Sequence, residues 1–360
     1  MRKALILLNM GGPNNLSEVE VFLKNMFNDP FILGIKSGFW RSVLASLIVK
    51  SRTASARSNY EKLGGRSPIC SITEALCERV NELARAKFGA ELKFENAASV
   101  SAANELSQDV SSQSKPSQEA QTQNEAPQDE KPIDELICDY AMNYTPPFAE
   151  DVFKKYADFD EIILMPLYPH FSKTTVQSSL CSAEAALKRL GIKNYRIIDI
   201  FYDSAAYNEI LLNLITGCVA EFSADEISQI SLIFSAHSLP VKMVAAGDPY
   251  EAQVKAHVQI LKDLLAARGI KFKEIILAYQ SRLGPVKWLE PNVADVLRDL
   301  QSKKALIFPI AFCVDNSETD FELDIFYRAR ARELDYEYYE VCKCPNSGED
   351  FAKFILAQAL

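Results

Sequence analysis

The stretch SLIFSAHSLP at residues 231–240 decides the fold class of this chain. Its apolar residues run continuously instead of alternating with polar ones, which is typical of a strand that is covered on both faces. His237 follows directly on this strand. We therefore expect its side chain at the carboxyl end of a buried strand, which is where ligands bind in sheets of parallel strands.

Seven further runs of this kind recur along the chain, at 4–8, 135–140, 161–165, 195–200, 273–279, 304–310 and 337–341. Helix-length stretches lie between them, at 71–88, 148–157, 178–190, 204–222, 250–268, 316–333 and 348–360. Strands that alternate with helices predict a doubly wound parallel sheet. Eight strands fit two α/β halves that face a central cleft, with residues 1–166 in the first half and 167–344 in the second. The last helix, at 345–360, is expected to join the first half.

One segment departs from this pattern. Residues 99–131 are rich in Ser, Gln, Glu and Asn and contain almost no large apolar side chain. Such a segment cannot bury enough surface to offset its ordering entropy. We interpret it as a disordered surface insertion in the first half, because strand-like sequence resumes at Ile133.

The overall composition is that of a soluble globular protein. The 360 residues carry a formal net charge of −9 without a basic cluster, which argues against a nucleic-acid partner. Eight scattered cysteines indicate a reducing cytoplasm and not a disulfide framework. No run of about 18 apolar residues predicts a membrane span. The segment 31–49 has an apolar helical face, and three interpretations stay open for it: the mouth of a binding site, contact with a membrane surface, or an ordinary buried helix.

Three histidines are present, and only His237 lies where this fold class places reactive groups. A histidine at a strand end is positioned for proton transfer or metal ligation. The alternative is a loop histidine whose hydrogen bonds are simply satisfied. His170 and His257 have weaker contexts, and we expect His257 at the surface of a helix.

A cluster of carboxylates follows the strand at 304–310. On an α-helix, Asp315, Glu318 and Glu322 would share one face within about 60° of one another. Like charges at this spacing repel, and a bound cation would relieve the repulsion. The alternative is that these acidic residues merely favour a helix start, with Asp315 as its cap.

Glycines follow the first strand in the sequence Asn9-Met10-Gly11-Gly12-Pro13. Their spacing differs from G-x-G-x-x-G, so a dinucleotide site has little support. We expect these glycines to let the backbone approach a flat ligand closely, with Met10 directed at it.

Seven motifs, taken together and in order, resemble those of the ferrochelatase family, which inserts ferrous iron into a porphyrin in the last step of protohaem synthesis. They run through nearly the whole chain outside the insertion. The motifs are LLNMGGP at 7–13, YEKLGGRSPI at 60–69, AMNYTPP at 141–147, MPLYPHFSKTTVQSS at 165–179, FSAHSLP at 234–240, YQSRLGPVKWLEP at 279–291 and FPIAFCVDNSETDFELD at 308–324.

The resemblance implies two Rossmann-like, chelatase-type halves, each with a four-stranded parallel sheet, that enclose a porphyrin cleft. It places the catalytic, metal-contacting histidine at His237 and the facing glutamate at Glu318, with Asp315 and Glu322 as secondary acidic residues. The segment 31–49 corresponds to an apolar lip of the pocket. Six further residues match porphyrin-binding positions: Met10, Arg52, Ser67, Tyr144, Tyr168 and Ser172.

The implied enzyme is a lyase that inserts Fe²⁺ into protoporphyrin IX, with iron as a substrate and no cofactor required. His237 suits removal of the pyrrole protons, and oxygen ligands such as Glu318 replace the water shell of the metal. His237 as base, as metal ligand, or as both are all open. The implied location is the cytoplasm, with peripheral contact to the inner face of the cell membrane through 31–49.

The chain departs from the family pattern at three positions. Ser238 replaces the usual glycine after the histidine, Asn316 stands where some members have a second histidine, and Phe326 interrupts the acidic row. The chain after Cys344 lacks the cysteine-bearing extension of some members, so we expect no 2Fe–2S cluster.

Three alternatives compete with this interpretation. Coproporphyrin III as substrate would need extra polar partners for its two additional carboxylates, and the apolar lip favours protoporphyrin IX. A non-catalytic tetrapyrrole carrier would not need both His237 and Glu318. A nucleotide-dependent oxidoreductase would need the glycine fingerprint that the chain lacks.

Overall fold

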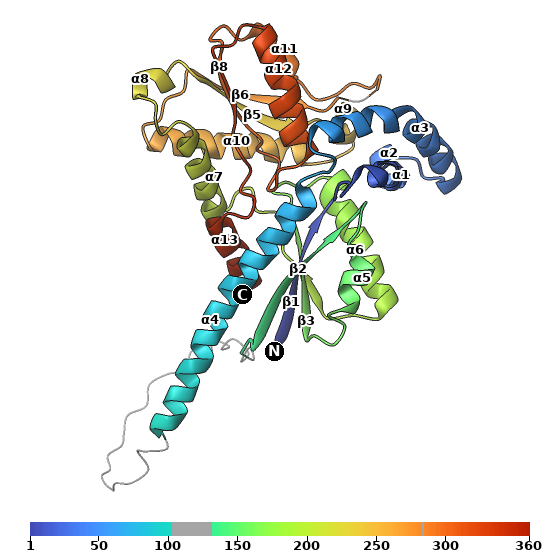
Figure 1. The fold of residues 1–360 in the computed structure, drawn as a ribbon, viewed down its shortest axis with the longest axis vertical. Helices are drawn as coiled ribbons and strands as arrows, with labels where there is room; N and C mark the ends of the chain where they lie inside the picture. Colours follow the sequence, from blue (N-terminus) through green and yellow to red (C-terminus); the bar gives the residue numbers. More distant parts are fainter. Residues whose placement is uncertain (103–131, 283) are drawn as a thin grey trace, which may run out of the picture.

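The computed structural model describes residues 1–102, 132–282 and 284–360 (Figure 1). Within these residues the chain forms two four-stranded sheets flanked by helices. The insertion predicted at 99–131 lies outside the described residues, except for 99–102, which continue helix α4 (Ile69–Ala102).

The two sheets share one strand order. The first runs β2-β1-β3-β4 and consists of β1 (Arg2–Asn9), β2 (Glu135–Met142), β3 (Glu161–Pro166) and β4 (Tyr195–Ile197). The second runs β6-β5-β7-β8 and consists of β5 (Ser231–His237), β6 (Glu274–Gln280), β7 (Lys304–Phe308) and β8 (Tyr338–Val341). Every pairing is parallel. The predicted fold class, two halves with a four-stranded parallel sheet each, is confirmed.

Continuous apolar sequence forms the central strands because helices cover both of their faces. Residues 4–9 of β1 and 231–236 of β5 are all buried, whereas the edge strand β4 has no buried residue. Each fully buried aliphatic side chain contributes about 1.5–3 kcal/mol, so the central strands anchor the two cores.

Helices surround the sheets on both sides (Figure 1). The first half contains η1 (Leu16–Glu18), α1 (Val19–Asn28), α2 (Pro30–Leu33), α3 (Gly38–Lys62), α4, α5 (Ala149–Lys154), η2 (Lys173–Gln177) and α6 (Ser178–Leu190). The rest of the chain contains α7 (Ala205–Cys218), α8 (Ala224–Ile227), α9 (Val241–Ala245), α10 (Tyr250–Ala267), α11 (Val293–Asp299), η3 (Ser317–Tyr327), α12 (Arg328–Glu333) and α13 (Glu349–Ala359).

Two observations bear on the predicted division of the chain. β4 pairs with β3 in the first sheet, although it lies beyond the boundary predicted at residue 166. That boundary is therefore too early, because the first sheet takes its fourth strand from 195–197. The last helix, α13, packs against α4 of the first half and also against α7.

The segment α1 to α3 forms a small cluster of its own beside the first sheet (Figure 1). Its core contains Val19, Phe27 and Tyr60, and Tyr144 after β2 joins it. Several large apolar residues of α3 nevertheless face solvent: Phe39, Trp40, Val43, Leu44 and Leu47. Across the described parts of the chain, we find no helix whose length and apolar character would let it cross a bilayer.

Equivalent strand ends in the two sheets carry most of the predicted site residues. Met10 follows β1, and His237 ends β5, the strand with the same place in the second sheet. In the first sheet β1 lies between β2 and β3, and in the second sheet β5 lies between β6 and β7. Connections leave such a central strand in opposite directions, and ligands typically bind there. Tyr168 comes directly after β3, and Glu318 lies on η3, the helix that follows the equivalent strand β7.

Candidate active site

His237 and Glu318 are in direct contact. Nδ1 of His237 lies 2.9 Å from Oε2 of Glu318, although 81 residues separate them in the sequence. A carboxylate can only accept hydrogen bonds, so Nδ1 carries the proton and donates it to Glu318. The other ring nitrogen, Nε2, is then left with its lone pair available.

The charge of Glu318 sets the proton affinity of this histidine. Burial disfavours the imidazolium, but the charge and hydrogen bond of Glu318, with a smaller contribution from Glu322, outweigh it and raise the pKa of His237 above its ordinary value. About 38% of the His237 side chain and 24% of the Glu318 side chain remain exposed. The pair is therefore both polarised and accessible.

The start of η3 presents Glu318 to the histidine. Asn316 caps this helix: its side chain accepts a hydrogen bond from the backbone of Glu318 at 2.8 Å, and Thr319 returns the contact to the backbone of Asn316 at 2.9 Å. The helix itself is a π-helix over its full length, 317–327, a rare form that occurs frequently at functional sites. Its capping box holds Glu318 in the first turn.

Glu322 lies one turn further and is bound to a different loop. Its Oε1 accepts a hydrogen bond from the backbone of Ser281 at 2.9 Å, and its Oε2 accepts one from the Ser281 hydroxyl. Burial and the charge of Glu318 raise the pKa of Glu322. Ser281 has a left-handed backbone with φ of 66°, which is unfavourable for a residue other than glycine. Glu322 therefore holds this strained residue in place.

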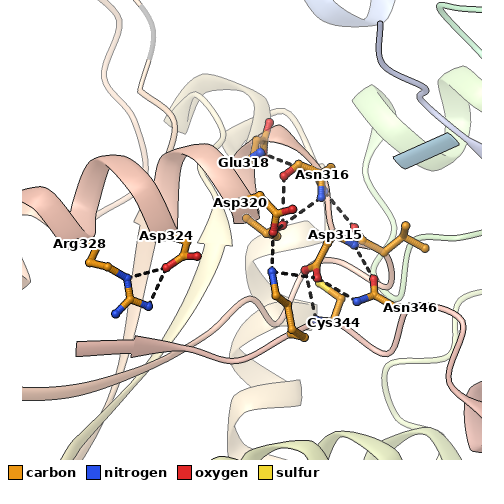
Figure 2. A network of polar contacts seen from close by, with 11 residues as sticks. Asp315, Asn316, Glu318, Asp320, Asp324, Arg328, Cys344 and Asn346 are labelled. Atoms are coloured by element: carbon orange, nitrogen blue, oxygen red, sulfur yellow. Dashed lines mark hydrogen bonds and ion pairs between the residues drawn. The ribbon is translucent and has the colours of Figure 1, made fainter. Parts of the chain in front are cut away.

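Asp315 does not join the acidic face predicted for it. It precedes η3, and its carboxylate accepts hydrogen bonds from the backbone of Cys344 at 3.2 Å and from the side chain of Asn346 at 2.8 Å (Figure 2). The backbone of Asp315 donates in return to Asn346 at 2.8 Å. The prediction that Asp315 shares a helical face with Glu318 and Glu322 is wrong, because the helix begins only at Ser317 and Asp315 lies in the preceding loop. Its role as a secondary acidic residue stays a prediction.

Two further observations concern the acidic and metal-binding side chains around the site. Within residues 1–102, 132–282 and 284–360, no group of three or more His, Cys, Asp or Glu side chains is arranged to hold a metal ion. Phe326, which interrupts the acidic row, is 54% exposed. The acidic residues near His237 are thus Glu318 in direct contact and Glu322 through its charge.

Tyr144, a predicted pocket residue of the first half, is held by a hydrogen bond to a buried acidic side chain. The hydroxyl of Tyr144 donates to the buried carboxylate of Asp29 at 2.7 Å, and Ser178 donates to the same oxygen. Asp29 also caps α2 by accepting from the backbone of Phe31 at 2.7 Å. Burial, then the charge of Asp29, raises the pKa of Tyr144, so this hydroxyl stays protonated.

Tyr168 and Ser172 lie buried on the segment that follows β3. The Tyr168 hydroxyl contacts the Ser179 hydroxyl at 3.3 Å, and the Ser172 hydroxyl donates to Asp248 at 3.0 Å. The second of these contacts joins the two halves, because Asp248 precedes α10. Both side chains are fixed by the protein itself.

The remaining predicted pocket residues differ in exposure. Ser67 is buried, Met10 is partly buried between two cores, and Arg52 is exposed on α3. A Cβ atom at Gly12 would lie 2.6 Å from the Cβ of Ser67. Glycine is therefore needed at this position to pack against Ser67, and the close approach of a flat ligand to this backbone stays a prediction.

His257 is not at the surface, as expected from its helix, but fully buried. Its Nδ1 lies 2.9 Å from Nε2 of His170, which is also buried. Burial lowers the pKa of both rings, to about 3 for His257. The sequence pattern missed this pair because the two residues lie 87 positions apart.

Ser238, which stands where the family usually has glycine, does not adopt a positive φ. The serine is therefore accommodated without backbone strain.

Sequence reasoning also missed Gln280 and Asp29. Gln280 ends β6 directly beside His237, and its side chain is fully buried. A polar residue at the carboxyl end of a neighbouring strand was the available signal for Gln280. Asp29 carried only the signal of a helix cap before Pro30.

The chain is similar to known proteins in sequence and resembles two solved structures. The ferrochelatase family model matches residues 2–110 and 97–359. Among solved structures, a multi-domain protein of Deinococcus radiodurans with similarity to chelatases has a TM-score of 0.44 and 11% identity, covering 99% of this chain and 55% of that one. SirB from Bacillus subtilis with Fe³⁺ has a TM-score of 0.45 and 10% identity, covering 63% of this chain and 82% of that one.

Curated relatives resemble the chain from end to end. A ferrochelatase of Campylobacter fetus is 50% identical over 99% of this chain and 98% of its own length. One of Campylobacter concisus is 45% identical over 100% and 98%, and one of Helicobacter pylori is 39% identical over 99% and 92%. With the family model across nearly the whole length and relatives of this similarity, the chain belongs to the ferrochelatase family.

Proposed function

We propose that this ferrochelatase inserts Fe²⁺ into protoporphyrin IX and that His237 and Glu318 are its working pair. The observation that carries the assignment is the 2.9 Å contact between the two side chains at the carboxyl end of the second sheet. Family membership makes the protein a porphyrin metal chelatase, a lyase of haem synthesis. The substrate and the roles of the residues are the part we propose.

His237 serves as the proton acceptor. A free-base porphyrin has two pyrrole N–H groups, and both protons leave as the metal forms its bonds to nitrogen. Nε2 takes them one at a time and, because the side chain is partly exposed, releases the first to water before it accepts the second. The hydrogen bond from Nδ1 to Glu318 leaves Nε2 as the basic nitrogen, and the negative charge of Glu318 stabilises the imidazolium that forms. The raised pKa of His237 supports this role, because it increases the affinity of Nε2 for a proton.

Glu318 serves as the oxygen ligand that receives iron. Hydrated Fe²⁺ sheds its waters stepwise, and a partly exposed carboxylate can replace them. Glu322 has both oxygens engaged by Ser281, so in this arrangement it contributes negative charge and not a ligand. Nε2 of His237 can contact the arriving metal only while it keeps its lone pair, that is, when it does not carry a proton.

The first half holds the macrocycle. Met10, Tyr144, Tyr168 and Ser172 follow the strands of the first sheet, while Ser67 and Arg52 belong to the segments between β1 and β2. Most of these side chains are buried and fixed by hydrogen bonds within the protein. A rigid wall of this kind suits a flat ligand that must be held against an approaching metal.

The apolar lip favours protoporphyrin IX over coproporphyrin III. Phe39, Trp40 and Leu47 of α3 are 70%, 64% and 63% exposed. Such a surface suits the vinyl edge of protoporphyrin IX, whereas the two extra carboxylates of coproporphyrin III require polar partners. A carrier without catalysis has no use for a polarised histidine–carboxylate pair.

Anaerobic Fe²⁺ insertion with each porphyrin in turn tests the reaction and the substrate together. We expect a higher kcat/KM for protoporphyrin IX than for coproporphyrin III. The opposite preference would reverse the substrate assignment. Tight porphyrin binding without metal insertion would instead support the carrier.

The same exposed residues of α3 support peripheral contact with the inner face of the cell membrane. Trp40→Ser with Leu47→Ser should weaken co-sedimentation with lipid vesicles, and a double substitution at exposed polar positions of α3, Ser42→Ala with Ser46→Ala, serves as the control. Equal sedimentation of both variants would remove the membrane from the proposal.

A further inference from the structure

Gln280 joins the two elements that carry His237 and Glu318. It ends β6, where its Cα is the register partner of His237 on β5. Its side chain is fully buried. A buried amide must satisfy both its donor and its acceptor, so the groups that it contacts are held in a defined arrangement.

Each polar group of Gln280 reaches the neighbourhood of the working pair. Nε2 donates to the backbone carbonyl of Glu318 at 3.2 Å, and Oε1 accepts from the hydroxyl of Ser235. The backbone carbonyl of Gln280 accepts from the backbone of Ser238 at 2.9 Å. Ser235 and Ser238 lie before and after His237 in the sequence. Gln280 therefore binds residues on both sides of the histidine and also the backbone of Glu318.

The chemistry of the partners fixes the orientation of this amide. The carbonyl of Glu318 can only accept, so Nε2 must face it, and Oε1 then faces Ser235. A glutamate at this position would offer no donor to Glu318. An apolar residue would leave the carbonyl of Glu318 and the hydroxyl of Ser235 without this partner.

The next residue strengthens the same connection. Ser281 keeps its left-handed backbone while both of its donors bind Glu322 on η3. Residues 280 and 281 therefore tie the end of β6 to η3 at two successive points. The strained backbone of Ser281 thus lies next to the contacts that hold η3, and strain of this kind is typical of functional sites.

We propose that Gln280 is a positioning residue that sets the contact between the imidazole of His237 and the carboxylate of Glu318. This inference rests on the proposed function of that pair. Gln280 touches neither porphyrin nor iron in this proposal. It acts through the ends of β5 and η3, and its loss would change the alignment of the pair without removing either member.

Gln280→Met tests the proposal, because methionine has a similar length and lacks both polar groups. We expect kcat for anaerobic Fe²⁺ insertion into protoporphyrin IX to fall about tenfold to a hundredfold, as displacement of a catalytic group does. The KM for the porphyrin should change less than twofold (about the error of such an assay). A rise in the KM for the porphyrin with an unchanged kcat would contradict a positioning role.

Asn81→Leu is the matched control. Asn81 also binds a strand through both ends of its amide, donating to the carbonyl of Cys138 at 2.8 Å and accepting from its backbone nitrogen at 2.7 Å. It lies on α4, away from His237 and Glu318. The control should lower thermal stability as Gln280→Met does, yet leave kcat unchanged.

Gln280→Glu and Ser235→Ala cover the case in which Gln280→Met does not fold. The first replaces the donor to Glu318 with a carboxyl oxygen and adds an acid beside Glu318, and the second removes only the donor to Oε1. Both should lower kcat, the second by less. A folded Gln280→Met with parental kcat would overturn the proposal, as would unchanged kcat in both of these milder variants.

His237→Ala and Glu318→Gln, assayed in parallel, separate the two possible failures. If they retain turnover, the proposed function of the pair fails. If they lose turnover while the folded Gln280 variants do not, only the positioning role fails.

Discussion

The protein holds two histidine contacts of equal length in different surroundings. Nδ1 of His237 lies 2.9 Å from Glu318, and Nε2 of His170 lies 2.9 Å from Nδ1 of His257. The first pair is partly exposed and contains a carboxylate, and the pKa of His237 is raised. The second is buried and contains no acid, and burial lowers the pKa of both rings. Proton affinity thus follows the charge of the partner and access to water, not the length of the hydrogen bond.

This difference assigns separate tasks to the two pairs. A histidine that gains a proton easily can take protons from a substrate. A buried pair that resists protonation is poorly suited to take protons from a substrate. His170 follows β3 and His257 lies on α10, so the buried pair fixes one half of the molecule against the other.

Replacing His237 should give the largest effect. We expect His237→Ala to lower Fe²⁺ insertion about a thousandfold or more, because a general base contributes about 10²–10⁴-fold. The porphyrin should still bind, since the first half holds it. Fluorescence titration with protoporphyrin IX beside an anaerobic insertion assay measures both quantities, and near-parental turnover would exclude His237 as the base.

Removing the negative charge of Glu318 should make His237 resemble the buried pair. The raised pKa predicts that the acidic limb of kcat/KM lies above the ordinary histidine value of 6.5. In Glu318→Gln, burial is no longer opposed by this charge, so the limb should move to lower pH while kcat falls. Glu322→Gln should move it less. A pH profile with the same limb in all three proteins would refute this account of the site.

The buried pair predicts a loss of stability in acid. The pKa of His257 is about 3 in the folded protein against 6.5 when exposed, so below pH 6.5 the unfolded chain binds more protons than the folded one. Stability should therefore fall as the pH decreases, by about 2 kcal/mol at pH 5. Urea unfolding from pH 8 to pH 5 measures the loss. His257→Gln should show a weaker pH dependence, and an unchanged slope would mean that His257 does not contribute.

Asp315 should give the smallest effect on activity. Asp315→Asn weakens its contacts with Cys344 and Asn346, which should cost about 1 kcal/mol of stability. The KM for Fe²⁺ should stay near the parental value because the carboxylate faces away from the pair. A large rise in that KM would return Asp315 to the path of the metal.

Sequence reasoning located the elements of the fold better than it located their side-chain contacts. Strand ends at His237 and near Glu318 were visible because apolar runs mark buried strands. The division at residue 166 failed although the strand at 195–200 was predicted, because an apolar run indicates that a strand forms and not which sheet it joins. The helical face that included Asp315 failed because the pattern assumed an α-helix, whereas η3 starts later and is a π-helix.

The sequence by itself determined the two parallel sheets, the placement of His237 at a strand end and of Glu318 after the strand at 304–308, and the family. These properties depend on local apolar periodicity and on motifs of neighbouring residues. Only the tertiary structure decided that Gln280 bridges the working pair, that His170 meets His257, and that Asp315 binds the loop after β8. Such contacts join residues that are distant in the chain, and their free energies depend on burial and on the direction of each hydrogen bond, which no local pattern records.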